Sequence, residues 1–430
     1  MDDLRARIYR AFDPRPLGSE DMDLYVALDD VRGNTGVVRR LAERIYLATG
    51  RTCQLLAGHR GGGKSTELRR LQRELAEGEP RFFVVFCQSD DDIDRNDVDF
   101  PEVLIAVVRQ MAAQLKDREG ISLKPGYFKD RLKRLKSILG SEVSFDSVEL
   151  DVGLVRLSGG IKGSPETRAR VREMLEPDTS NLLFAANDLI SKAKLELQKK
   201  GYRDLVILVD DLDKMVVRPH PTAGCSTAAH LFINREAQLA GFECHTVYTI
   251  PLALAYSAQE QTIANLYGGH VPVIPMIKVR HPPPTSKPYG AGVRKLREII
   301  AKRLTKARAK DTDLFRSDQV RDKLIKLSGG QPREIMIMVR EAIISGELPI
   351  TDRAIERAVR ESRRAYARQL RAEHWPIIEQ VKKSGTITRT EDNDELIRDL
   401  LDSRAVLQYM NDREWYDVNP VVADLKPPTS

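Results

Sequence analysis

A run of glycines followed by a lysine and two hydroxyl residues is the stretch of the sequence best suited to chemistry. It matches the pattern G-x-x-x-x-G-K-[ST] at every fixed position. Glycines let the backbone turn with positive φ and bring its N–H groups against phosphate oxygens. The lysine adds a mobile positive charge, and the hydroxyl after it suits Mg²⁺. The spacing therefore predicts a nucleotide-phosphate site formed by Gly58, His59, Arg60, Gly61, Gly62, Gly63, Lys64, Ser65 and Thr66.

A second chemical feature is an acidic stretch that follows an apolar run. Leu205–Val209 is expected to form a buried strand, and Asp210 comes where that strand ends. We expect Asp210 to hold Mg²⁺ together with Ser65, and Asp211 to polarise the water that attacks the terminal phosphate. A helix N-cap would also favour aspartate here, but the glycine loop upstream favours the metal. For Asp213, capping the next helix and supporting the metal site both stay open.

Short apolar runs alternate with helical patterns around both motifs. The run at 52–57 leads directly into the glycine loop, and a helix with leucines on one face follows the loop. Further buried strands are expected at 81–87, 204–211, 244–250 and 271–279. Such alternation predicts an α/β fold with a parallel five-stranded sheet.

Composition divides the chain into four parts. Residues 1–22 are expected to form an irregular N-terminal arm, and 23–285 an α/β domain. An insertion at about 120–180, with a β-hairpin between two helices, is expected to interrupt that domain. A proline-rich linker then leads to a helical lid at 290–371 and to a small domain at 372–430 with the order helix, helix, strand, strand.

The bulk composition excludes some classes of protein. Among the 430 residues, 41% are hydrophobic and 31% charged, and no run approaches the roughly 18 to 20 apolar residues of a membrane span. The amino terminus has no apolar signal stretch, and the four cysteines form no C-x-x-C pair. We therefore expect a cytoplasmic protein without a membrane partner. The net charge of +6 is interspersed, so it permits contact with nucleic acid without requiring it.

On these motifs the chain resembles the additional-strand P-loop ATPases, and more narrowly the AAA+ and STAND superfamilies. The apolar run that ends in Asp-Asp-Leu-Asp is similar to the Walker B form of STAND and KAP-type NTPases, whereas many AAA+ machines carry Asp-Glu. The stretch 324–343 is similar to the sensor 2 region of initiator-type AAA+ proteins, which implies that Arg333 lies over the γ-phosphate. The alternative is an arginine that faces solvent at a helix start. The resemblance also implies a sensor 1 residue at the end of the fourth strand, with Thr249 as the first candidate and Thr246 as the second.

The resemblance bears on three further segments. Residues 31–33 match the segment that frames the base in these families. The unit at 372–430 looks like a winged helix, which touches DNA in initiators and packs on the nucleotide domain in STAND proteins. Its last helix is acidic, which disfavours entry into a DNA groove, and Trp415 and Tyr416 are expected to be packing aromatics. No residue is obvious as a trans-acting arginine finger. The candidates lie on one helix face: Arg168, Arg170 and Arg172. The alternative is that this face is simply solvated.

These features predict an ATP-binding and ATP-hydrolysing switch of the AAA+/STAND type, with ATP or ADP and Mg²⁺ as cofactors. The lid would sense the nucleotide and pass its state to a protein partner, an effector or a sensor, in bacterial signalling or antiviral defence. Homo-oligomerisation stays open, and DNA is not the favoured partner. Two alternatives remain: a DNA-binding initiator or loader that contacts the duplex through its basic insertion and C-terminal unit, and a scaffold that holds nucleotide without hydrolysing it.

Overall fold

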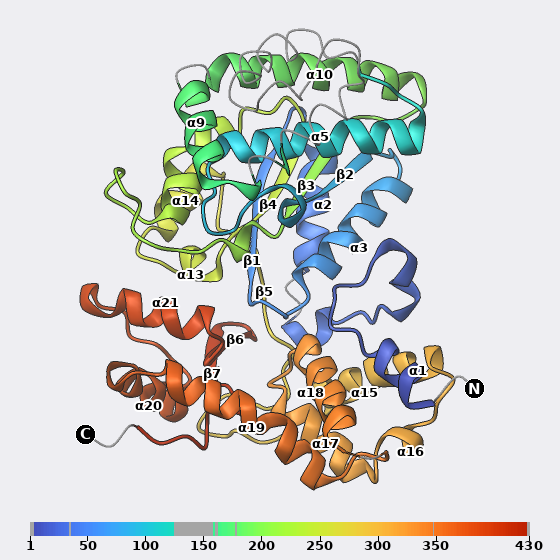
Figure 1. Ribbon diagram of the computed structural model, residues 1–430, viewed down its shortest axis with the longest axis vertical. Helices are drawn as coiled ribbons and strands as arrows, with labels where there is room; N and C mark the ends of the chain where they lie inside the picture. Colours follow the sequence, from blue (N-terminus) through green and yellow to red (C-terminus); the bar gives the residue numbers. More distant parts are fainter. Residues whose placement is uncertain are drawn as a thin grey trace. The chain divides into compact units, whose positions relative to one another are not determined.

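The computed structural model (Figure 1) describes residues 4–33, 36–123, 158–159, 162–176, 179–346 and 348–427. The chain forms two compact units, and each is described by itself. The loop unit comprises Met1–Val37, Gly58–Arg69 and Val273–Ser430, and the sheet unit comprises Val38–Ala57 and Arg70–Pro272. The division into four domains expected from the sequence stays a prediction. Within the described ranges, no helix has both the length and the apolar character that crossing a bilayer requires.

A five-stranded sheet with the order β2-β3-β4-β1-β5 confirms the predicted α/β fold. Its strands are β1 (Cys53–Gly58), β2 (Phe83–Gln88), β3 (Leu205–Asp210), β4 (His245–Thr249) and β5 (Val273–Ile274). The pairs β2–β3, β3–β4 and β4–β1 are parallel. The run expected at 271–279 pairs over only two residues, because Pro272 and Pro275 flank it and proline has no N–H to donate.

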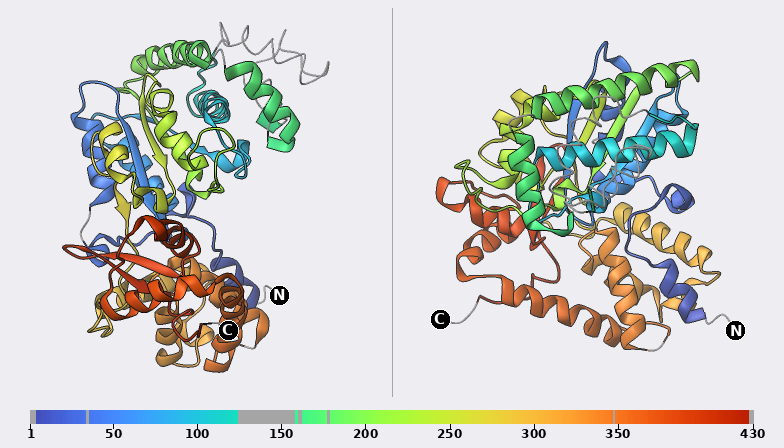
Figure 2. Two further views of the ribbon diagram at one scale, coloured as in Figure 1. Left: turned by 90° about the vertical axis from the view of Figure 1, so that its left-hand side faces the viewer. Right: turned by 45° about the horizontal axis from the view of Figure 1, so that its top comes forward.

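Two long helices lie over the sheet in the sheet unit. α5 (Phe100–Glu119) begins with a capping box of Asp99 and Glu102 and packs against β2 and β3. α10 (Thr179–Lys199) packs on α5 and β3, as both views in Figure 2 show. The other described helices between residues 37 and 266 are α2 (Val37–Leu47), α3 (Lys64–Glu77), α4 (Ser89–Asp92), α9 (Pro165–Leu175), η4 (Leu212–Lys214), α11 (Thr227–Ala229), η5 (His230–Asn234), α12 (Glu236–Leu239), α13 (Leu252–Ala255) and α14 (Glu260–Leu266).

The loop unit is mainly helical and has its own core. Its helices include α15 (Gly290–Lys306), α16 (Asp311–Leu314), α17 (Asp318–Leu327), α18 (Pro332–Ser345) and α19 (Asp352–Gln369). The prediction of an irregular arm is wrong over Leu4–Ala11, which forms helix α1. Ile8 and Phe12 are fully buried in the same core cluster as the apolar faces of α15 and α18. The burial of these two side chains explains why the segment is ordered as a helix.

The end of the chain follows the predicted order of elements. Helices α20 (Trp375–Ser384) and α21 (Asp394–Asp402) precede the antiparallel hairpin of β6 (Val406–Met410) and β7 (Glu414–Val418). Trp415 stacks on Tyr409 with ring centroids 4.5 Å apart, and Tyr416 is buried against the helices, as expected for packing aromatics. The assignment as a winged helix stays a prediction. Most of the predicted β-hairpin of the insertion lies outside the described residues.

Candidate functional site

The glycine loop lies between β1 and α3, as its motif requires. Gly61 and Gly63 have φ angles of 80° and 101°, which side chains with a Cβ rarely adopt. A Cβ added to Gly61 would lie 3.2 Å from Cβ of Arg333, and one added to Gly63 would lie 3.2 Å from Nη2 of Arg32. Glycine is therefore required at both positions for two reasons: the backbone turn and the close approach of an arginine.

Lys64 is buried within the loop that it is expected to serve. Its Nζ donates to the carbonyl oxygens of Gly58, at 2.5 Å, and His59, at 3.1 Å. Ser65 and Thr66 follow in the first turn of α3, where the N–H groups and the helix dipole favour an anion. Arg60 is exposed. The loop thus offers a positive helix end, a placed ammonium group and a hydroxyl, which together fit the phosphates of a magnesium nucleotide.

Arg32 braces the loop from the N-terminal segment. Its Nη2 donates a hydrogen bond to the carbonyl oxygen of Gly62, and its Nη1 lies 3.2 Å from Oε1 of Glu67 on α3. Tyr25 donates to the same carboxylate, at 3.2 Å from Oε2. Burial lowers the pKa of Arg32, and the charge of Glu67 opposes that shift. Sequence reasoning placed residues 31–33 near the base; the contact of Arg32 with the loop has no sequence signature, because it joins residues 30 positions apart.

Arg333 lies against the loop from the opposite end of the chain. It is the second residue of α18, and its Cβ, Cγ and Cδ lie near Gly61 while the side chain remains exposed. It makes no hydrogen bond or ion pair with the residues that the structure describes. An unpaired guanidinium beside a phosphate loop suits contact with a phosphate. Its role as a γ-phosphate sensor stays a prediction.

His59 joins the loop to the C-terminal hairpin. Its side chain is 2% exposed, and its Nε2 accepts a 2.8 Å hydrogen bond from the N–H of Gln408 on β6. The carbonyl oxygen of Gln408 accepts in turn from the N–H of Met276, at 3.0 Å. Burial, followed by the charge of Lys64, lowers the pKa of His59 to about 3, so the ring is neutral and can accept. The ring of His59 thus links the loop to the backbone of the hairpin.

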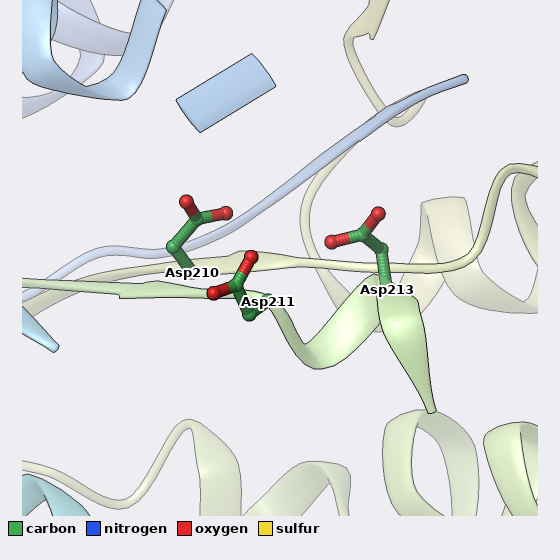
Figure 3. A group of neighbouring side chains, drawn as sticks. All are labelled: Asp210, Asp211 and Asp213. Carbon is green, nitrogen blue, oxygen red and sulfur yellow. The ribbon is translucent and has the colours of Figure 1, made fainter. Parts of the chain in front are cut away.

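An acidic cluster follows β3 in the sheet unit (Figure 3). Asp210, Asp211 and Asp213 are buried, and one carboxylate oxygen from each lies within 4.8 Å of the others. Among the described residues this is the one group of three or more that could hold a metal ion in this way. Oxygen ligands from carboxylates are those that Mg²⁺ prefers. The residues present therefore fit the predicted metal site, and Asp213 is close enough to take part.

Asp211 occupies an unusual backbone conformation. Its φ of 71° is in the left-handed region, which costs free energy for a residue with a side chain and is concentrated at functional sites. Burial, followed by the neighbouring charge of Asp210, raises the pKa of Asp211 to about 7. Lys214 opposes the shift through an ion pair with Oδ1 of Asp211 at 2.5 Å, and its Nζ also lies 2.9 Å from Oδ2 of Asp90. Lys214 and Asp90 were not singled out from the sequence.

Thr249 ends the strand that lies between β3 and β1. It is fully buried, and its Oγ1 has no hydrogen-bond partner among the described residues. Thr246 lies three residues earlier in the strand, away from its carboxyl end, so Thr249 is the better placed of the two. The carboxyl ends of β3, β4 and β1 lie at one edge of the parallel sheet, which is where ligands bind in open α/β folds. A buried hydroxyl without a partner at this edge is consistent with a polar ligand.

The arginines proposed as a finger are mostly engaged within the chain. Arg168 is 3% exposed and forms ion pairs with Asp94 and Asp97. Arg172 pairs with Asp97 and with the buried carboxylate of Glu102. These arginines therefore hold α9 to the loop that precedes α5, and neither is a solvated residue. Of the three candidates on this face, Arg170 is the one left exposed.

Comparisons with known proteins find no matching family model and no matching curated protein. Among solved structures, Cdc6p from Pyrobaculum aerophilum is 12% identical over 96% of this chain and 94% of its own, with a TM-score of 0.41. Drosophila ORC bound to DNA is 12% identical over 97% and 89%, with a TM-score of 0.39. The Aeropyrum pernix ORC1 protein in complex with DNA is 15% identical over 94% and 96%, with a TM-score of 0.36. At these identities and TM-scores, function has to be inferred from the residues of this chain.

Proposed function

We propose that the chain binds ATP with Mg²⁺ and hydrolyses it as a P-loop ATPase of the AAA+/STAND type. The observation that carries the proposal is the complete glycine loop between a buried strand and a helix, with Lys64 inside it and the exposed Arg333 beside it. The buried acidic cluster after β3 supplies the second element that a P-loop ATPase needs.

Each residue of the proposed site has a distinct part. The loop N–H groups and Lys64 would bind the phosphates, and Ser65 and Asp210 would hold the metal ion. Bound Mg²⁺ would neutralise charge on the transferred phosphate. Asp211 would accept a hydrogen bond from the attacking water and orient it. Thr249 would form a hydrogen bond with a polar ligand at the same edge of the sheet.

Three segments of the loop unit contact the loop, which supports a role as a switch. Arg333 from the lid, Arg32 from the N-terminal segment and Gln408 from the hairpin all lie against it. A change in the loop on nucleotide binding would therefore alter contacts with the lid and the hairpin together. We propose that a protein partner, an effector or a sensor, reads this change, and bacterial signalling or defence is the role that the resemblance implies.

A second candidate function is that of a DNA-binding ATPase of the initiator or loader type. α21 carries Asp394 and Glu395 in its first turn, which disfavours it as a groove-reading helix. The observation that favours this candidate is the exposed arginine face of α19, whose helix has five arginines on one side. In the third candidate, a scaffold, nucleotide would be bound and not hydrolysed.

Phosphate release by the purified chain distinguishes these functions. It is measured with ATP and Mg²⁺, with and without duplex DNA, together with the mass of the particle in ATP and in ADP. Steady turnover supports the ATPase and excludes the scaffold. Turnover that rises with DNA favours the second candidate, and tightly bound ADP without turnover contradicts the first.

A further inference from the structure

Five arginines form a row along the exposed face of α19. Counted at about 3.6 residues per turn, their spacing of four, three, four and four residues places them within an arc of roughly 80° and over about 22 Å of helix. All five side chains are exposed. We call them the arginine row: Arg353, Arg357, Arg360, Arg364 and Arg368.

The positive charge of the row is largely uncompensated. Arg364 pairs with Glu361, at 2.6 Å. The other four members make no hydrogen bond or ion pair with any residue that the structure describes. Arg363, just off the row, shows the contrast, because it pairs with Glu356 and Asp424. Like charges on one helix face repel each other, so such a row costs stability unless something binds it.

The opposite face of α19 fixes the row in place. Ala354, Ile355 and Val359 are buried in the core of the loop unit, together with α18. Thr351 caps the helix by accepting from the N–H of Ala354. The backbone of α19, labelled in Figure 1, therefore fixes the positions of the five arginines before any partner arrives.

We propose that the arginine row binds the phosphate backbone of double-stranded DNA. Guanidinium groups bind phosphates in a bidentate manner, and a straight row of about 22 Å matches roughly two-thirds of a helical turn of DNA. The row includes no aromatic side chain on which unpaired bases could stack, which disfavours single strands. It also includes no large apolar side chain that could enter a bilayer, since that side of α19 is buried.

This inference deepens the second candidate function and rests on it. It places the duplex on α19, whereas the sequence had placed it on the basic insertion and the C-terminal unit. It does not depend on ATP hydrolysis, because binding to a row of fixed charges needs no nucleotide. Contacts of this kind position a protein on DNA and carry no sequence information.

The test is fluorescence anisotropy of a labelled duplex of about 30 base pairs, titrated with the full chain without nucleotide at several salt concentrations. In the row variant, Arg353, Arg360 and Arg368 are changed to glutamine. We expect its affinity to fall at least tenfold at low salt. The slope of log K against log salt should become shallower by about 2.7, because each phosphate that an arginine neutralises contributes about 0.9 to it. Changing the same three residues to lysine should retain most of that slope.

A matched control removes the same charge elsewhere. Arg40, Arg51 and Arg294 are exposed arginines outside α19, and changing all three to glutamine should leave the affinity within about twofold of the unmodified chain. Thermal unfolding of every variant checks that the fold is retained, and phosphate release checks the ATPase separately. A row variant that loses DNA binding and keeps turnover supports the inference even if the switch proposal fails.

Five outcomes would overturn the inference, of which four concern nucleic acids and soluble competitors and the fifth concerns vesicles. The first four are absence of duplex binding by the unmodified chain at low salt, an equal drop in affinity in the row variant and the control, tighter binding of duplex RNA through the same three residues, and displacement of the DNA by polyglutamate at matched charge. The fourth outcome would assign the row to an acidic protein partner. Vesicles that contain phosphatidylserine should not bind through the row, and binding to them would also contradict it.

Discussion

The glycine loop and the acidic cluster differ in the groups that they present and in the charge of those groups. In the proposed site the loop would bind through its backbone, and three side chains at it, Lys64, Arg32 and Arg333, are cationic. The acidic cluster consists of buried carboxylates, one of them on a left-handed residue beside Lys214. We propose that the loop attracts phosphate and that the cluster holds a cation and a water. Variants on the two sides should fail in different ways.

The largest effect is expected at Lys64. Lys64→Ala should weaken ATP binding by about 100-fold or more, because it removes the charge that the loop carbonyls hold in place. Isothermal titration calorimetry measures the affinity. Lys199→Ala on α10, an exposed lysine, is the matched control and should bind as the unmodified chain does. Equal affinity in the Lys64 variant would show that the loop does not bind the phosphates.

Substitution of Asp210 should affect ATP binding less than substitution of Lys64 does, and should affect the Mg²⁺ requirement more. Asp210→Asn should raise the Mg²⁺ concentration for half-maximal turnover by about tenfold or more, because it removes one charged ligand. Asp213→Asn should change it less than about threefold if Asp213 serves mainly as structural support. Equal shifts in the two variants would make Asp213 a ligand and settle the alternative that the sequence left open.

Arg333 lies on the loop side and tests the sensing of the terminal phosphate. Arg333→Ala should reduce the preference for ATP over ADP by about tenfold, roughly 1.4 kcal/mol, and leave ADP affinity nearly unchanged. Competition binding with the two nucleotides gives the ratio. Arg294→Ala on α15 is the control. If Arg333→Ala instead lost affinity for both ATP and ADP, as is expected of Lys64→Ala, Arg333 would support the loop itself and would not sense the terminal phosphate.

The smallest effect concerns stability and pH. The pKa of His59 is about 3 in the folded chain and near 6.5 when unfolded, so the unfolded state binds more protons between these values. Stability from the neutral ring is complete above about pH 6.5 and is lost as the pH falls. His59→Gln should reduce the drop in unfolding free energy between pH 7.5 and 5.5 by about 1 kcal/mol. Urea unfolding at both pH values measures it, and an unchanged drop would mean that the pKa of His59 is not lowered in the folded chain.

The comparison also shows what a sequence can predict. The loop, the aspartates and the strands that carry them were identified because each depends on neighbours in the sequence: a fixed glycine spacing, an apolar run, a carboxylate at its end. The order of helix, helix, strand, strand at the end of the chain follows from local periodicity in the same way.

Contacts between distant segments were not predictable. The bond of His59 to Gln408 joins residues 349 positions apart, and that of Arg32 to Gly62 joins residues 30 apart. The arginines of α9 and α19 have similar local patterns, yet Arg168 is buried in ion pairs and the arginine row is largely unpaired among the described residues. Whether a charge has a partner depends on tertiary packing, which spacing along one helix does not encode.

Phosphate release by the unmodified chain, beside Lys64→Ala and Asp211→Asn, tests the central proposal most directly. We expect the unmodified chain to release phosphate from ATP only with Mg²⁺, and both variants to lose about 100-fold or more of that rate. Asp211→Asn should still bind ATP, because its side chain orients water and does not hold the phosphates, whereas Lys64→Ala should not bind it. Full turnover in both variants would contradict the assignment of the loop and the acidic cluster as one ATPase site.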